Sequence, residues 1–448
     1  MPRRKKEEVQ INLAPQKKGK PIILLKGMKD VLPSEQKYWD FINSAVVETC
    51  EKYNFSRIET PILESVNLFL KAVGKQTDIV EKELYSFFDK AKELIALRPE
   101  GTAGVARAYI EHGMFNLPQP LKLYYIGPMF RHDKPQAGRY RQFHQFGLEV
   151  IGERNPAVDA HLIIIAADFY KRLGIETKVQ INSIGCPTCR QEYINNLTGY
   201  YKSKKSSICE DCKKRLIRSP LRLLDCKEPK CQPIKEDAPQ IVDWLCEDCK
   251  NHFMKVLEFL DESDIAYDLN PKLVRGLDYY TNTVFEFFDK DDAAFKSALG
   301  GGGRYDNLLD ILGSRPTPAS GFALGVERII SKIKEKNIVI PEKPSPDVFL
   351  AQIGEQSKRK AMVLFEKLYE NGIKVIENFS KDSLKSQLEL ANKNGVKLVL
   401  ILGQREVVDG TILIRDMING VQEVVNYSKV LDEVKKRLGE INDLKLKK

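Results

Sequence analysis

Cysteine spacing restricts most strongly what this chain can fold into. Eight of its nine cysteines lie in four pairs: Cys186 with Cys189, Cys209 with Cys212, Cys226 with Cys231, and Cys246 with Cys249. No apolar stretch typical of an export signal follows the charged start of the chain, so disulfides are disfavoured and paired thiolates at this spacing indicate tetrahedral zinc. Eight thiolates predict up to two structural Zn²⁺ ions, with reduced, metal-free thiols as the alternative. The spacing leaves open which pairs share a metal.

The charge is concentrated at the start of the chain. Lys and Arg number 71 against 62 Asp and Glu, which gives a net charge of +9 over 448 residues. Residues 1–20 alone hold a net +5, so residues 1–21 are predicted to form a basic arm, either a solvated tail or a contact to a polyanion. The longest unbroken apolar run, Leu162 to Ala167, has six residues, which excludes a membrane-spanning helix and favours a cytoplasmic protein.

The rest of the chain divides by its hydrophobic pattern. Hairpin-like strands separated by helices predict an antiparallel sheet backed by helices over 22–185 and 266–335, interrupted by a cysteine-rich helical insertion at 186–265. A linker with three prolines follows at 336–346. Residues 347–440 alternate buried strands with helices, which predicts a separate α/β domain. The expected fold class is therefore α+β.

Some local expectations are specific enough to test. Ser34 is predicted to cap a helix that runs to about Tyr53, and Phe55 to Leu63 to form one strand. The stretch from Leu273 to Phe288 is strand-like, which would place Arg275 and Tyr279 on one face and Tyr280 on the other. The glycine run Gly300 to Gly303 predicts either a flexible turn or a strand where a ligand touches the backbone.

The hairpin formed by Leu121–Arg131 and Arg141–Gly152 carries the first candidate site. In a strand, Gln145, Gly147 and Glu149 share a face. An amide and a carboxylate on either side of a glycine make a plausible floor for a small ligand that carries an ammonium or imidazole group. The alternative is a sheet face of solvated polar side chains.

Three arginines supply the second candidate site. Arg131, Arg275 and Arg328 each lie on or beside a different predicted strand, near glycine and in apolar surroundings. They would repel one another on one sheet unless an anion lay between them, which indicates a polyphosphate ligand. The sequence has no GxxxxGK[ST] motif, so a P-loop nucleotide fold is unsupported.

These residues lie in segments that resemble a known family. FRHDKPQAGRYRQFHQFGLE, GFALGVERI and FSRIETPILE resemble the second, third and first signature motifs of class II aminoacyl-tRNA synthetases, the second in its histidyl form. LVRGLDYYT and GGGGRYD resemble two segments peculiar to the histidyl-tRNA synthetase family. The resemblance is ordered along the chain and covers about residues 22–430. It implies a class II catalytic core and a C-terminal anticodon-binding domain.

The resemblance also implies a reaction: activation of histidine by ATP with Mg²⁺ to histidyl-adenylate, and transfer to the 3′ end of tRNA(His). Arg131 and Arg275 would be catalytic, with Arg131 on the α-phosphate and Arg275 on the charge that develops there. Arg328 would hold the adenine and γ-phosphate. Glu100 would lie at the ATP and histidine sites, and Thr102 and Arg275 at the histidine site. The other histidine-site residues implied are Gln145, Glu149, Tyr279, Tyr280, Gly301, Gly302 and Gly303.

The same resemblance implies the macromolecular partners. Lys134, Gln136 and Arg139 would contact the tRNA acceptor end, and the first motif implies a homodimer. Two alternatives remain: a histidine-sensing regulatory subunit of ATP phosphoribosyltransferase, and a zinc-dependent nucleic-acid-binding module. The first usually lacks a domain like that after Asp347, and the second does not explain the three arginines.

Overall fold

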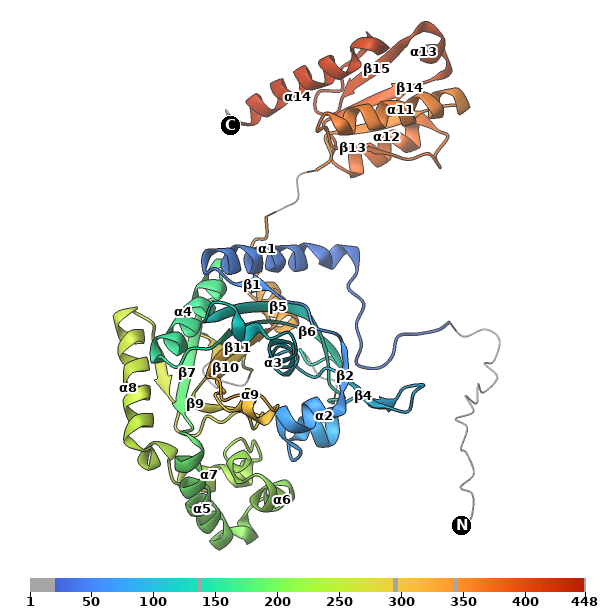
Figure 1. Ribbon diagram of the computed structural model, residues 1–448. Helices are drawn as coiled ribbons and strands as arrows, with labels where there is room; N and C mark the ends of the chain where they lie inside the picture. The colour runs from blue at the N-terminus through green and yellow to red at the C-terminus, as the bar shows by residue number, and fades with distance from the viewer. Residues whose placement is uncertain (1–20, 135–137, 293–296, 342–344, 447–448) are drawn as a thin grey trace, which may run out of the picture. The chain divides into compact units, whose positions relative to one another are not determined.

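The structure is a computed structural model of the 448-residue chain, and it describes residues 21–134, 138–292, 297–341 and 345–446. The chain divides into two compact units, residues 1–340 and 341–448. Each unit is described by itself (Figure 1). The basic arm predicted at residues 1–21 lies, apart from Pro21, outside the described residues.

An eight-stranded sheet forms the centre of the first unit. Its strand order is β1-β5-β6-β11-β10-β9-β7-β8, and the five pairs from β5 to β7 are antiparallel, whereas β1 and β8 pair in parallel at the two edges. The strands are β1 Ser56–Arg57, β5 Leu121–Phe130, β6 Gln142–Ile151, β7 Thr177–Ser183, β8 Tyr267–Leu269, β9 Thr281–Asp289, β10 Gly300–Arg304 and β11 Ala319–Gly325. A smaller sheet, in the order β2-β4-β3, consists of β2 Leu63–Ser65, β3 Ser86–Phe88 and β4 Leu94–Leu97.

Strand alternation divides the large sheet into an apolar face and a face with polar residues. Phe146, Leu148 and Val150 of β6 pack in one apolar core with residues of four helices. These helices are α1 Gln36–Lys52, α4 Pro156–Arg172, α8 Glu247–Glu262 and α10 Val326–Glu335 (Figure 1). The other face packs against α2 Val66–Phe69, α3 Thr102–Glu111 and α9 Leu308–Ile311. Period-two alternation therefore leaves Gln145, Gly147 and Glu149 on the face opposite the helical core.

The cysteine-rich segment lies between β7 and β8 in the sequence. It contains α5 Pro187–Ser203, α6 Glu210–Arg218 and α7 Gln232–Glu236 and ends in α8. Because β7 and β8 are neighbours in the sheet, this helical segment is an excursion from the sheet edge (Figure 1). Its Tyr193 and Leu223 belong to the same apolar cluster as Tyr279 and Tyr305, so it packs as part of the first unit.

The second unit is an α/β domain. Strands β12 Val348–Gln352, β13 Val375–Glu377, β14 Leu398–Leu402, β15 Thr411–Asp416 and β16 Gln422–Asn426 form a sheet in the order β13-β12-β14-β15-β16. Its helices are α11 Glu355–Glu370, α12 Leu384–Lys393, α13 Gln404–Asp409 and α14 Val430–Leu446. Strands β12 and β14 are buried throughout and contribute to two separate apolar cores, as expected for parallel strands covered on both faces.

Two local predictions were wrong in detail. Ser34 does not cap a helix, because Pro33–Glu35 form a 3₁₀ turn and α1 begins at Gln36 without a side-chain cap. The strand predicted from Phe55 to Leu63 is two short strands, Ser56–Arg57 and Leu63–Ser65, in different sheets. Pro61 lies in the break between them, where its missing N–H prevents a continuous ladder.

The architecture confirms the predicted α+β class with a helical cysteine-rich region and a C-terminal α/β domain. Across the described ranges of the chain, no helix combines the length and apolar character needed to cross a bilayer.

Candidate active site

A cavity of about 1190 Å³ opens on the polar face of the large sheet. It brings together side chains that are distant in the sequence. Of the predicted site residues, those that line it are Glu100, Thr102, Arg131, Arg139, Gln145, Arg275, Tyr279, Tyr280, Gly301 and Arg328. Glu149 is buried beside them, and Lys134 lies on the exposed start of the following loop. Gln136 lies outside the described residues.

Glu149 is a buried carboxyl group at the base of the cavity. The Thr102 hydroxyl donates to its Oε1 at 2.6 Å, and the Tyr305 hydroxyl donates to Oε2. Burial raises the pKa of Glu149 from 4.5 to about 8, with the nearby Glu100 contributing in the same direction and the two hydroxyls opposing it. The protonated, neutral form of Glu149 therefore predominates at pH 7.

Glu100 lies at the start of α3. Its carboxylate accepts hydrogen bonds from the backbone N–H groups of Thr102 at 2.7 Å and Ala103 at 2.9 Å, so it satisfies two free donors at the helix N-terminus. Burial raises its pKa, and these backbone donors act against that change. The Tyr279 hydroxyl lies 3.5 Å from Oε2 and connects this carboxylate to the predicted histidine-binding segment.

Glycines bring the sheet backbone close to the cavity. A Cβ on Gly301 would lie 2.5 Å from the Phe285 carbonyl and 2.7 Å from the Arg275 guanidinium, and one on Gly303 would lie 3.1 Å from the Tyr280 ring. Gly302 faces the other way: a Cβ there would meet Phe322 of the apolar core. Of the three predicted wall glycines, Gly301 lines the cavity, and Gly302 and Gly303 do not. The run is strand β10, which decides between the strand and turn readings of the sequence.

The three arginines converge on one cavity. The Arg131 Nε donates to the Pro99 carbonyl at 2.9 Å, and its guanidinium lies over Phe143, with 5.3 Å to the ring centroid. Burial lowers the pKa of Arg131 and of Arg328, and in both cases a neighbouring arginine adds to the effect. Cations gathered at one cavity in this way suit a polyanionic ligand.

Arg275 differs from the other two because it already has a carboxylate partner. It forms an ion pair with Glu286 of β9 and lies over Tyr280, with 5.6 Å to the ring centroid. Burial acts to lower the pKa of Arg275, but Glu286 together with Tyr280 and Tyr279 outweighs it, and the net pKa is raised. Glu286 was not identified from the sequence; a single carboxylate within the apolar strand Val284–Phe288 was the available signal.

The prediction that Tyr280 points away from the site was wrong. Regular strand structure begins only at Thr281, and residues 275–280 form an irregular turn, so two-residue alternation does not apply to them. Tyr279 and Tyr280 both line the cavity, with ring centroids 4.7 Å apart. Tyr305, which lies in the GGGGRYD motif but was not among the predicted site residues, is a third tyrosine of this group, with its ring centroid 5.6 Å from that of Tyr279.

The loop after β5 is described up to Lys134 and from Gly138. Arg139 pairs with Asp133 at 2.9 Å, and the Asp133 carboxylate also accepts the backbone N–H of Lys134 at 2.7 Å. The Lys134 side chain is exposed, and Arg139 lines the cavity mouth near Arg328. The described part of the loop therefore presents cations beside the cavity.

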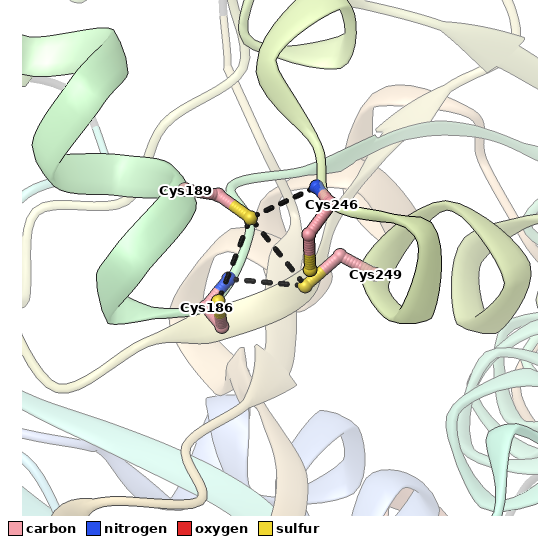
Figure 2. A group of neighbouring side chains, drawn as sticks. All are labelled: Cys186, Cys189, Cys246 and Cys249. Atoms are coloured by element: carbon pink, nitrogen blue, oxygen red, sulfur yellow. Dashed lines mark hydrogen bonds between the residues drawn. The ribbon is translucent and has the colours of Figure 1, made fainter.

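The eight paired cysteines form two groups. Within each group the four Sγ atoms lie within 4.8 Å of one another. The groups are Cys186, Cys189, Cys246 and Cys249, and Cys209, Cys212, Cys226 and Cys231. Figure 2 shows the first group, in which one pair comes from the start of α5 and the other from the start of α8. This arrangement identifies which pairs lie together, a question that the spacing left open.

Comparison with known proteins identifies the family. The family model "Histidyl-tRNA synthetase" matches residues 27–195 and 233–329, and the model "Anticodon binding domain" matches 347–437. The chain belongs to the histidyl-tRNA synthetase family. As a member it is an aminoacyl-tRNA synthetase of class II, a ligase that uses ATP with Mg²⁺. The stretch between the two matched parts of the synthetase model, 196–232, contains the second group of cysteines.

Relatives of this family cover nearly the whole chain. The histidine–tRNA ligases of Pelotomaculum thermopropionicum and Desulforamulus reducens are 44% and 45% identical, over 92% of this chain and 97% and 98% of theirs. The crystal structure of apo histidyl-tRNA synthetase from S. aureus is 36% identical, with a TM-score of 0.77, and covers 93% of this chain and 100% of that one. These likenesses confirm the family and the fold that the sequence motifs predicted.

Proposed function

We propose that the cavity carries out both steps of histidine–tRNA ligation: formation of histidyl-adenylate from histidine and ATP, and transfer of histidine to tRNA(His). The observation that carries the proposal is that groups suited to phosphates and groups suited to an amino acid lie at one cavity. Arg131, Arg275 and Arg328 suit the phosphates, and Gln145 with Glu149 suits the amino acid.

The histidine end of the cavity contains groups that match the charges of the substrate. Gln145 has a buried Oε1 without a hydrogen-bond partner, and Glu149 is held mainly neutral by burial. A ligand that donates to the amide and places positive charge near Glu149 would relieve both conditions. Glu100, Thr102, Tyr279 and Tyr280 surround the same space. We assign histidine to this end.

The phosphate end of the cavity requires no covalent catalyst. Attack of the histidine carboxylate on the α-phosphorus displaces pyrophosphate, and this step depends on positioning and on stabilisation of charge at the phosphate oxygens. We assign Arg131 and Arg275 to the α-phosphate and Arg328 to the adenine and γ-phosphate. Mg²⁺ enters with ATP and neutralises phosphate charge.

The Arg275→Ala variant tests this assignment. It removes a charge that acts mainly in the transition state, so histidine-dependent ATP–pyrophosphate exchange should fall by about a hundredfold or more while histidine affinity changes little. Arg218→Ala, a surface arginine paired with Glu81, is the matched control and should exchange normally. An unchanged exchange rate in Arg275→Ala would reject the assignment.

The tRNA contacts belong to the loop and the second unit. Lys134, Gln136 and Arg139 are proposed to meet the acceptor end, and the domain at 347–440 the anticodon. We also propose a cytoplasmic homodimer. Charging of a tRNA(His) transcript by wild type and by Arg139→Gln, with amino-acid activation as the reference, tests the loop: only the charging rate should fall.

Structural zinc completes the proposal. Each group of four cysteines would bind one Zn²⁺, because its sulfurs lie close enough together to enclose a single ion. Elemental analysis of purified protein should give two zinc ions per chain, and less than half an ion per chain would reject both sites.

A regulatory subunit of ATP phosphoribosyltransferase is the second candidate. A Bacillus halodurans protein titled "ATP phosphoribosyltransferase regulatory subunit/histidyl-tRNA synthetase" has a related fold, with 23% identity and a TM-score of 0.60. The anticodon-binding match at 347–437 favours the synthetase over this regulator. Histidine-dependent exchange distinguishes the two, because a regulator would bind histidine without exchanging pyrophosphate.

A further inference from the structure

The irregular segment 275–280 carries three residues assigned to the active site and pairs with no strand; a single backbone bond, from the Asp278 N–H to the Val73 carbonyl at 3.1 Å, holds its middle. Arg275, Tyr279 and Tyr280 lie in this turn. Two of its backbone carbonyls accept hydrogen bonds from arginines of the cysteine-rich segment. The Arg190 guanidinium donates to the Tyr280 carbonyl at 2.7 Å, and the Arg222 guanidinium donates to the Gly276 carbonyl at 3.4 Å.

Arg190 is attached to the first cysteine group. It directly follows Cys189 in the first turn of α5, and its backbone N–H donates to the Cys186 carbonyl at 3.0 Å. On the other side of the segment, the Cys249 thiol lies 3.2 Å from Oδ1 of Asn282, and the Asn282 backbone N–H donates to the Gly185 carbonyl at 3.0 Å. The first group thus borders the end of the segment that carries Tyr280.

Arg222 is attached to the second cysteine group. It lies four residues before Cys226, and its carbonyl accepts a hydrogen bond at 3.3 Å from Arg215 of α6, the helix that follows Cys209. Arg222 also pairs with Asp78 at 3.1 Å. Its guanidinium therefore contacts two residues that line the cavity, Asp78 and Gly276. The second group borders the end of the segment that carries Arg275.

The geometry of the sulfurs fits metal coordination. Tetrahedral Zn²⁺ with bonds of ~2.3 Å places its sulfurs about 3.8 Å apart. The distance is 3.5 Å for Cys186–Cys189 and 3.9 Å for both Cys189–Cys249 and Cys209–Cys226. A disulfide would require ~2.05 Å.

Backbone amides also point at the sulfurs. In the first group, the N–H of Cys186 donates to Cys249 Sγ at 3.3 Å, and the N–H of Cys246 donates to Cys189 Sγ at 3.0 Å. The second group has the same kind of bond, from the N–H of Cys209 to Cys231 Sγ at 3.2 Å. Such donors stabilise thiolates, the form in which cysteine binds metal.

We infer that Arg190 and Arg222 are positioning residues, each anchored by a Zn²⁺–tetracysteine site, and that together they hold the two ends of segment 275–280 in its active form. The inference rests on the proposed function: on the two zinc sites for the anchoring, and on the proposed reaction for the kinetic consequences. Arg190 fixes the backbone of Tyr280 and so acts on histidine binding. Arg222 fixes the backbone next to Arg275 and so acts on the chemical step.

The two arginine variants have different expected effects. Arg190→Gln should raise the KM for histidine in pyrophosphate exchange roughly tenfold with a smaller change in kcat, and Arg222→Gln should lower kcat roughly tenfold with a smaller change in KM. Both should keep two zinc ions per chain. Lys202→Gln in α5, the helix of Arg190, and Arg218→Gln at the end of α6, four residues before Arg222, remove exposed charges and should match wild type.

The metal half of the inference is tested with one cysteine variant in each group. Cys246→Ser should lose one zinc ion and reproduce the KM effect of Arg190→Gln, and Cys231→Ser should lose one zinc ion and reproduce the kcat effect of Arg222→Gln. Thermal unfolding of each variant shows whether the unit remains folded. A variant that unfolds is replaced by wild-type protein depleted of zinc by a chelator and then reloaded.

Amide hydrogen exchange provides a readout that does not depend on activity. Peptides covering 275–282 should exchange faster in all four variants, while peptides of the second unit stay unchanged. The inference would be overturned if amide exchange in this segment were unchanged in the variants, or if purified wild-type protein contained no zinc. Failure of the proposed reaction looks different: wild-type protein would not catalyse histidine-dependent pyrophosphate exchange, yet the amides of 275–282 would still exchange faster in the variants.

Discussion

At the scale of single residues, the active site depends on acids kept away from water. Glu100 and Glu149 are buried and Glu286 is partly buried beside the cavity, and the loss of water contact raises the pKa of each. Different groups stabilise the negative charge of each acid. Backbone N–H groups donate to Glu100, two hydroxyls donate to Glu149, and the Arg275 guanidinium pairs with Glu286. Under the proposed function, Glu149, which has neither a cation nor a backbone N–H as partner, is the acid that interacts with the substrate.

The raised pKa of Glu149 predicts a pH-dependent stability. The folded protein holds a proton on this group up to about pH 8, whereas the unfolded chain releases it near pH 4.5. The folded state therefore binds more protons, and the contribution of Glu149 to the free energy of unfolding falls as pH rises from about 4.5 to 8 and is constant above that.

Glu149→Gln isolates this effect. Its amide cannot ionise, so the difference in unfolding free energy, wild type minus variant, should decline across that pH range. Denaturant unfolding at a series of pH values measures it. A flat difference curve would show that Glu149 titrates normally in the folded protein.

At the scale of elements, the glycine strand β10 controls how near a ligand can come to the sheet. The strand lies between β9 and β11, and Gly301 pairs with Glu286 on one side and Ala323 on the other. A side chain at this point would occupy the space between the Phe285 carbonyl and Arg275. The absence of a Cβ is what lets the cavity reach the backbone.

Gly301→Ala should therefore damage both stability and catalysis. The added methyl group is expected to destabilise the first unit by about 1–3 kcal/mol and to reduce pyrophosphate exchange at least tenfold. Gly199→Ala, in α5 with no heavy atom within 4 Å of the new Cβ, is the matched control and should stabilise by about 0.5–1 kcal/mol. Thermal unfolding with exchange assays measures both. Normal activity in Gly301→Ala would mean that the strand does not border the ligand.

Regular periodicity was readable from the sequence, and irregular backbone was not. The alternation in β6 correctly separated Phe146 and Leu148 from Gln145 and Glu149, because a strand imposes a two-residue period. The two-residue period failed for segment 275–280, because this segment is a turn whose carbonyls accept hydrogen bonds from side chains in a distant part of the chain. The partner of Arg275 was missed for the same reason: Arg275 lies in this turn, and the path that brings it to Glu286 of β9 follows no two-residue period.

At the scale of the whole molecule, the chain has two separately packed bodies. The second unit has its own two apolar cores, formed by residues between Val348 and Ile441, and the first has two others. Every described residue that lines the cavity lies before residue 341. Amino-acid activation and reading of the anticodon are thus expected to be separable.

Truncation after Ile340 tests this separation. The shortened protein should keep histidine-dependent pyrophosphate exchange within about fivefold of wild type, because no cavity residue is removed. Its kcat/KM for tRNA charging should fall at least a hundredfold with the loss of one anchoring surface. Circular dichroism confirms that the fragment is folded. Loss of exchange in folded protein would show that the second unit contributes to the cavity.

The backbone wall at Gly301 also has a consequence for the accuracy of translation, if the cavity accepts histidine as proposed. Amino acids bulkier than histidine would meet main-chain carbonyls, which cannot rotate aside as side chains do. Smaller ones would fit but would leave the buried Oε1 of Gln145 without a hydrogen-bond partner, and a polar site rejects ligands that leave its groups unpaired. Errors at histidine codons are thus limited in two ways: larger amino acids are excluded by the shape of the cavity, and smaller ones by the hydrogen bonds they fail to make.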